Sequence, residues 1–189
     1  TDFMIFTSPY TWLTKTAERN AIIILFVLAL LIIVSLQKIG NSLKNQVAPH
    51  GIVSFELSKT LQQANSILNS WNHKAKIDAA LSLGIDYLFL FVYPLLISLL
   101  CHRLAMQTWK EQIRFVFLIG IILSWLQFLA GFLDAIENYF LIQLLIGSMN
   151  TFWPKLAYWS AISKFVIIIF GIGYVIMSVV FNISRKVRH

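Results

Sequence analysis

Four stretches of the chain consist almost entirely of apolar residues, and each is long enough to cross a membrane as a helix. They cover about residues 21–38, 79–101, 115–146 and 157–181. A helix needs roughly 20 mostly apolar residues to cross a hydrocarbon core about 30 Å thick. Because the apolar runs are continuous and do not alternate, the pattern predicts an all-α, polytopic membrane protein with four transmembrane helices.

The first stretch, at 21–36, is short enough to resemble the core of a secretory signal peptide. No small-residue cleavage pattern follows it, since the next residues read QKIGNSLKN. We therefore expect this stretch to be retained as the first spanning helix. The chain of 189 residues then suits a single transmembrane domain over 1–189, without a separate soluble domain.

The loop between the first two spans has a different pattern. Over about residues 52–71, apolar side chains recur every three or four positions, on one helical face: Val53, Leu57, Leu61, Ala64, Leu68 and Trp71. The opposite face is polar, so this segment is predicted to be an amphipathic helix that does not span. We expect it to lie on the outer membrane surface or to cap the bundle, with a re-entrant segment as the alternative.

Polar residues interrupt the third span at regular intervals. Small and polar side chains fall every three or four positions on one helical stripe: Gly120, Ser124, Gln127, Gly131, Asp134 and Asn138. Small residues in such a stripe allow close helix packing, so the stripe is predicted to face protein and not lipid. Glu137 lies one helical step to the side of it.

Two other spans carry matching faces. The second span has Ser82, Asp86 and Tyr93 on one face, and the fourth has Ser160, Lys164, Gly171, Tyr174 and Ser178. The first span offers almost nothing polar beyond Ser35. The second, third and fourth spans are therefore predicted to share a polar seam, with the first span more peripheral.

Composition excludes several classes of protein. The chain is 58% hydrophobic and 12% charged, whereas a soluble domain is about 25% charged. The net charge of +7 is interpreted as topology and contact with lipid headgroups. Nucleic acid is not expected as a partner, because no basic cluster is interleaved with aromatic residues. A single cysteine, Cys101, excludes an internal disulfide, and without an HExxH motif or a cysteine pair no metal site is expected.

Basic residues predict the orientation of the bundle. With a cytoplasmic N-terminus, the inner side holds Lys15, Arg19, Arg103, Lys110, Arg114, Arg185, Lys186 and Arg188. The outer side and its span then hold Lys38, Lys44, Lys59, Lys74, Lys76, Lys155 and Lys164. The margin grows because Lys59 is far from any span and Lys164 lies inside one. Both termini are expected to be cytoplasmic.

Charged residues inside the spans are the candidate site. Counted at about 1.5 Å per residue from the cytoplasmic ends, Asp86, Asp134 and Lys164 all fall in the outer part of the bilayer. Lys164 can neutralise one acid, which leaves an excess of negative charge over Asp86, Asp134 and Glu137. A buried carboxylate must find a partner or take up a proton. The alternative is that these residues, with Asn138, only clamp the bundle together.

The outer loop adds two more candidates, His50 and Glu56, which could fold over the acids. Four segments, PHGIVSFEL, SLGIDYLFLFVYPL, LDAIENYFL and AISKF, resemble an uncharacterised family of small bacterial four-span membrane proteins. The resemblance covers about residues 48–175 and implies a bacterial cytoplasmic membrane. It also implies that the following residues belong to recurring motifs of that family: Glu56, Asp86, Asp134, Glu137, Asn138 and Lys164.

Three classes of function fit this pattern. The first is a polar pocket in the outer leaflet that binds a small ligand, a cation or a lipid headgroup, a cationic ligand matching the excess acid. The second is an intramembrane enzyme that modifies lipids with a carboxylate as general acid or base. The third is an accessory subunit of a larger membrane complex, and a homodimer is a further possibility. The sequence identifies no cofactor.

Overall fold

The computed structural model describes residues 8–110 and 114–187, which contain helices and no strands. Four long helices form the molecule: α1 (Lys15–Gly40), α4 (His73–Lys110), α5 (Arg114–Leu145) and α6 (Phe152–Val187). All four are long and apolar enough to cross a membrane, which confirms the predicted spans. A short 3-10 helix, η1 (Asn41–Leu43), and two short helices, α2 (Ile52–Glu56) and α3 (Leu61–Ser70), lie between α1 and α4.

The spanning helices extend beyond the apolar runs that predicted them. For example, α4 has 38 residues, or about 57 Å at 1.5 Å per residue, against a hydrocarbon core of about 30 Å. Polar residues such as His73 and Lys74 at its start continue the same helix. Helix ends therefore project past the hydrocarbon on at least one side of the bundle.

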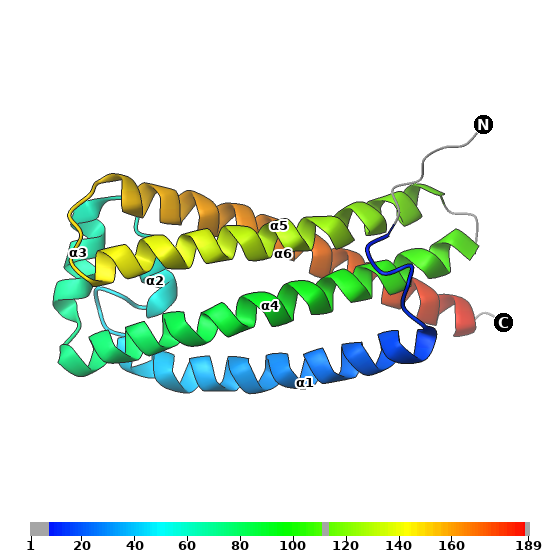
Figure 1. Cartoon of the computed structure of the whole chain (residues 1–189), viewed down its shortest axis with the longest axis horizontal. Helices are drawn as coiled ribbons and strands as arrows, with labels where there is room; N and C mark the ends of the chain where they lie inside the picture. The colour runs from blue at the N-terminus through cyan, green and yellow to red at the C-terminus, as the bar shows by residue number, and fades with distance from the viewer. Residues whose placement is uncertain (1–7, 111–113, 188–189) are drawn as a thin grey trace.

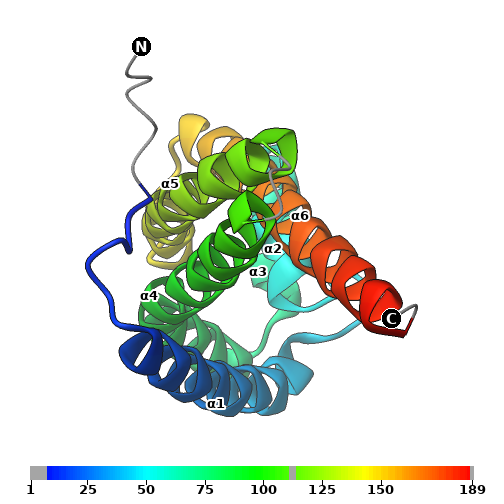
Figure 2. The same cartoon turned by 90° about the vertical axis from the view of Figure 1, so that its right-hand side faces the viewer.

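The four long helices run side by side, with α4 in the middle (Figures 1 and 2). Helix α4 packs against α1, α5 and α6, and α5 also packs against α6. Helix α1 packs mainly against α4 and buries only Ala29 and Ile32. The first span is therefore peripheral, as predicted. Large apolar side chains face outward, among them Phe91, Phe132 and Phe170, as expected for surfaces in contact with lipid.

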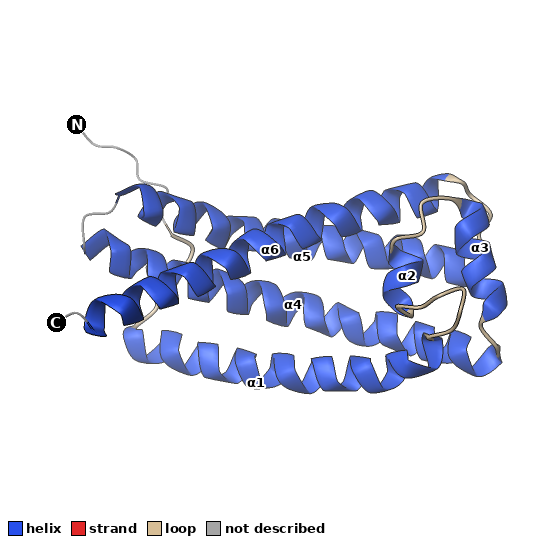
Figure 3. Ribbon diagram, turned by 180° about the vertical axis from the view of Figure 1, so that it is seen from behind, coloured by secondary structure: helices blue, strands red, loops and turns tan. Residues whose placement is uncertain are grey.

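The two ends of the bundle differ (Figure 3). One end, called the terminal end below, is where α1 begins and α6 ends. The other, called the loop end, carries η1, α2, α3 and the connection between α5 and α6. Helix α2 contacts α3, α5 and α6, so it lies against the spanning helices.

The prediction of one continuous amphipathic helix over 52–71 is wrong, because the segment forms two short helices separated by residues 57–60. Thr60 caps α3 by accepting from the backbone N–H of Gln63, whose side chain in turn accepts from the backbone of Thr60. The hydroxyl of Ser58 donates to the carbonyl of Phe55 at 2.6 Å. These side-chain bonds favour a new helix start over continuation of α2.

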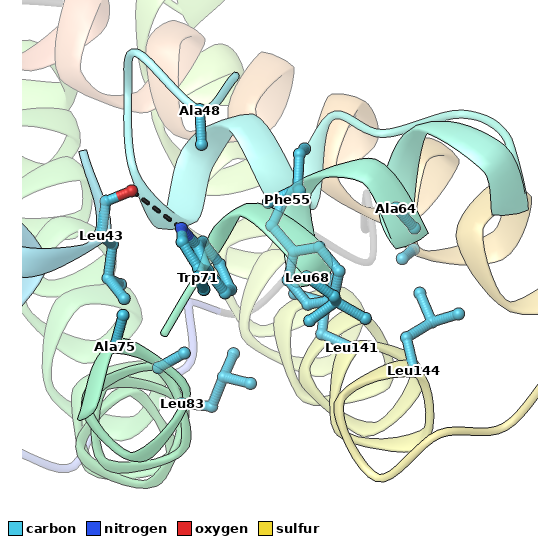
Figure 4. Close-up of a cluster of buried hydrophobic side chains, with 13 residues drawn as sticks. Leu43, Ala48, Phe55, Ala64, Leu68, Trp71, Ala75, Leu83, Leu141 and Leu144 are labelled. Carbon is cyan, nitrogen blue, oxygen red and sulfur yellow. Dashed lines mark hydrogen bonds between the residues drawn. The ribbon is translucent and has the colours of Figure 1, made fainter. Parts of the chain in front are cut away.

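An apolar cluster anchors the loop end (Figure 4). Phe55 of α2 and Trp71 after α3 pack edge to face, with ring centroids 5.5 Å apart. The Trp71 indole N–H donates to the carbonyl of Leu43 at 2.9 Å. Leu141 and Leu144 of α5 complete the cluster. Because Phe55 is fully buried, this cluster fixes α2, and with it the neighbouring residue Glu56, against the bundle.

Candidate functional site

The predicted polar seam is buried between helices. On α5, Ser124 and Gln127 are 0% exposed, Asp134 is 3% exposed and Asn138 is 1% exposed. The polar face of α6 is also buried, including Lys164 and Ser178. The stripe therefore faces protein, as its spacing predicted.

Lys164 of α6 is the centre of the candidate site. Its Nζ lies 2.5 Å from Asp134 Oδ1 and 2.7 Å from Glu137 Oε2. The two acids are three residues apart on α5, so both project to the same side of that helix. Helix α6 crosses this side and supplies one ammonium group to two carboxylates, and all three side chains are at most 6% exposed.

Asp86 of α4 joins the same cluster through Asn138. The Asn138 amide Nδ2 donates to Asp86 Oδ2 at 2.7 Å. Asp86 is half-buried and interacts electrostatically with Asp134 and Lys164. Three long helices thus contribute charged groups to one place, about 12–20 Å from the loop-end termini of these helices.

Helix α2 adds a fourth acid. The Glu56 carboxylate interacts with Lys164 and Asp134. Its desolvation by burial raises the pKa of Glu56 above the ordinary value for glutamate, while Lys164 opposes this shift and Asp134 adds to it. The loop end therefore places Glu56 within electrostatic range of Lys164 and Asp134.

His50 does not join them. It is exposed, and its backbone N–H donates to the Ser54 hydroxyl at 3.0 Å. Among the described residues, no hydrogen bond or ion pair connects its imidazole to the acids. The positive φ of 62° at Gly51 turns the chain between His50 and α2, so the two predicted loop residues have different surroundings.

The resulting cluster, called the acid cluster below, comprises Glu56, Asp86, Asp134, Glu137 and Lys164. Its four carboxylates outnumber its one ammonium group. Glu137 is 0% exposed, and its Oε1 atom has no hydrogen-bond partner. Isolated ionised carboxylates are strongly disfavoured in an apolar interior. The acid cluster therefore requires protons or a positively charged ligand to balance it.

The acid cluster is not a preformed metal cage. Within the part of the chain that the structure describes, no three histidine, cysteine, aspartate or glutamate side chains are grouped so as to hold a metal ion. A cation would instead use one or two carboxylates together with water or amide oxygens, as hard cations often do. An amine needs only hydrogen-bond acceptors, which carboxylates supply.

Two buried polar residues of the seam were not predicted as functional. The Tyr93 hydroxyl of α4 is buried and approaches Asp134, but it has no partner that meets hydrogen-bond geometry. Gln127 of α5 donates from Nε2 to the carbonyl of Ile167 at 3.3 Å, while its Oε1 has no partner. Their positions on the predicted seam were the available signal. That signal is not specific for function, because an aromatic residue or an amide at such a position equally suits packing.

An open hollow of about 400 Å³ lies on α2 and α3, and none of these acids lines it. Ser54, Ser58, Gln62 and Ser66 line it, and Glu56 does not. It is shallow and polar, and no charged side chain lines it. We therefore place the candidate site at the acid cluster.

Fold and site together define an all-helical bundle in which four helices are long and apolar enough to cross a membrane, with a cluster of acids around one lysine. No protein-family model, no curated protein and no solved structure matches the chain. The resemblance to small bacterial four-span proteins therefore remains an expectation from sequence.

Proposed function

We propose that this chain is an integral membrane protein that binds a small positively charged ligand at the acid cluster. The ligand class comprises inorganic cations and amines, including the amine of a lipid headgroup. The observation that supports this proposal is the fully buried Glu137, which shares Lys164 with Asp134 and has one unpartnered oxygen. Intramembrane ionisable groups are functional candidates by default.

Each residue has a distinct role in this proposal. The positive charge of Lys164 balances one ionised carboxylate, and its two ion pairs fix Asp134 beside Glu137. Asn138 orients Asp86 through its amide N–H. Glu56 covers the acid cluster from the loop end, on a helix held by the Phe55 side chain. In this proposal Glu137 Oε1 is the acceptor that meets the ligand.

The charge distribution supports a specific orientation. The start of α1 and the end of α6 lie at the terminal end, which carries Lys15, Arg19 and Arg103. We infer that this end is cytoplasmic, because basic residues are enriched there in membrane proteins. The acid cluster would then lie in the outer half of a bacterial cytoplasmic membrane, accessible to ligands from the outer side or from the outer leaflet.

Native mass spectrometry of the detergent-purified protein tests the proposal. We would compare the wild type with Glu137→Gln, and use Glu18→Gln on α1 as the matched control outside the acid cluster. The proposal predicts an adduct on the wild type and on the control that is lost from Glu137→Gln. The mass of the adduct distinguishes an inorganic cation from an amine-bearing lipid. Identical, adduct-free spectra for all three proteins would contradict the proposal.

A further inference from the structure

Four buried polar atoms without a hydrogen-bond partner lie along the seam of α4 and α5. They are Glu137 Oε1, the Tyr93 hydroxyl, Gln127 Oε1 and the Tyr10 hydroxyl. Leaving a buried polar atom unpaired is unfavourable, so few such atoms are expected in a well-packed bundle. Buried polar groups of this kind are commonly joined by internal water molecules.

Contacts between α4 and α5 establish the order of these groups along the bundle. Near the loop end, Asn138 contacts Asp86. Further toward the terminal end, the hydroxyls of Ser98 and Ser124 are 2.9 Å apart. The two antiparallel helices therefore keep one register, and the residues between these contacts lie at intermediate levels.

Tyr93 and Gln127 occupy the interval between the two contacts. The Tyr93 hydroxyl approaches Asp134 at the edge of the acid cluster. Gln127 lies about 10 Å further along α5 than Asp134, at 1.5 Å per residue, and is held by the carbonyl of Ile167 at 3.3 Å. The next turn of α5 brings Ser124, whose hydroxyl donates to the carbonyl of Ser98 at 3.0 Å.

A further group of polar side chains continues the series to the terminal end. The Tyr10 hydroxyl approaches Ser98 without meeting hydrogen-bond geometry. The Tyr10 ring packs edge-on against His102, with centroids 5.7 Å apart. His102 Nδ1 is hydrogen-bonded to the Ser8 hydroxyl, and both side chains are buried. From Glu137 to the level of His102 the series extends about 24 Å along the bundle.

We propose that this buried series of polar groups conducts protons between the loop end and the terminal end. Its members in order are Glu56, Glu137, Asp134, Tyr93, Gln127, Ser124, Ser98, Tyr10, His102 and Ser8. Carboxyl, hydroxyl, amide and imidazole groups all donate or accept hydrogen bonds. Chains of acidic and histidine side chains inside membranes serve as proton relays.

Packing selects the proton over larger cations. At Gly171, a Cβ atom would lie 2.5 Å from Gln127 Nε2 and 2.9 Å from Ile97 Cγ2. At Gly120, a Cβ atom would lie 2.3 Å from the Tyr174 hydroxyl. At these two positions the described helices approach too closely for a hydrated metal ion to pass between them. A proton needs only hydrogen-bonded side chains and single water molecules.

The transfer balances without any co-reactant. One proton enters the carboxyl groups at the loop end, and one leaves through His102 or Ser8 at the terminal end. Each carboxyl, hydroxyl and imidazole group passes on the proton that it receives and returns to its starting state. The driving force is the existing difference in proton electrochemical potential across the membrane. This inference shares the acid cluster with the proposed function but does not require the cationic ligand.

Proton flux into proteoliposomes tests the inference. Liposomes contain a pH-sensitive dye, and a potassium gradient with valinomycin supplies the membrane potential. The variant Gln127→Met removes the amide from the series while keeping its size, and Gln143→Met on the same helix is the matched control. We expect wild type and control to conduct protons, and Gln127→Met to conduct about tenfold less, the effect of losing one hydrogen-bonding group.

A second variant keeps the test decisive if Gln127→Met fails to fold. Tyr93→Phe removes a hydroxyl that has no hydrogen-bond partner, so the fold should survive, and flux should fall similarly. Wild-type flux equal to that of protein-free liposomes would overturn the inference, as would unchanged flux in a folded Gln127→Met or Tyr93→Phe. Because ligand adducts are measured separately by mass spectrometry, failure of one proposal is distinguishable from failure of the other.

Discussion

Lys164 is the residue on which the stability of the acid cluster depends most. It is the common partner of Asp134 and Glu137. We predict that Lys164→Met destabilises the protein by about 3–5 kcal/mol, because removing one member of a buried ion pair leaves an uncompensated charge. Chemical unfolding in detergent micelles measures this change. Adding Glu137→Gln should recover part of the loss, and a neutral effect of Lys164→Met would contradict the described ion pairs.

Glu56 should make stability depend on pH. Its pKa is raised in the folded protein by burial, against the opposing effect of Lys164 and with a further contribution from Asp134. The folded state therefore binds the proton more tightly than the unfolded state does. This contribution is fully present below the ordinary glutamate pKa of about 4.3 and is lost as pH rises through the raised pKa.

Thermal unfolding of the wild type and of Glu56→Gln, each measured over a range of pH, tests this prediction. The midpoint of thermal unfolding of the wild type in detergent should fall as pH increases above about 4.3. In Glu56→Gln this fall should be smaller, because the titrating group is absent. A Glu56→Gln profile parallel to that of the wild type would show that Glu56 is ordinary and solvated.

At the residue scale, spacing alone predicted which side chains share the seam, because a helix places residues three and four apart on one face. The spacing did not predict that Glu137 is fully buried. A residue one helical step from the stripe can face either the protein interior or the outside of the bundle. The prediction also grouped His50 with Glu56, although Gly51 separates their environments through its positive φ. Such local turns follow from backbone geometry that the hydrophobic pattern does not encode.

At the scale of elements, two glycines of α6 make a matched pair. A Cβ at Gly171 would lie 2.5 Å from Gln127 Nε2, whereas one at Gly173 would meet nothing within 4 Å. We predict that Gly171→Ala destabilises the protein by about 1–3 kcal/mol through overpacking. Gly173→Ala should be neutral or stabilising by up to about 1 kcal/mol, from helix propensity. Unfolding measurements that rank the two variants equally would contradict the close contact of α5 and α6.

The hydrophobic pattern predicted the long helices and only part of the loop segment. Continuous apolar runs predicted the four long helices, because crossing a bilayer demands them. The period of the loop segment correctly indicated helix but missed the break at 57–60. The signal was present as Thr60 and Gln63, a capping box in which each side chain bonds the backbone of the other. The capping box starts a new helix, although the amphipathic spacing continues through residues 57–60.

At the scale of the whole molecule, the orientation of the bundle is testable by thiol labelling. Cys101 is the one cysteine of the chain, and it is buried. In a Cys101→Ala background, introduced cysteines are therefore the reactive sites. We predict that Gln46→Cys at the loop end reacts with a membrane-impermeant reagent in intact bacterial cells. Thr11→Cys, near the start of α1, should react only after the membrane is permeabilised. The opposite labelling pattern would show that the bundle has the inverse orientation. The acid cluster would then lie in the cytoplasmic half of the membrane.

Four carboxylates around one lysine need added positive charge. Infrared spectroscopy of the protein in lipid bilayers tests this most directly, in buffer free of amines and of small metal cations. We expect a protonated carboxyl absorption at neutral pH in the wild type and in Glu18→Gln, and a weaker one in Glu137→Gln. If all carboxyl groups of the wild type are ionised under these conditions, the acid cluster is not the charge-deficient site described here.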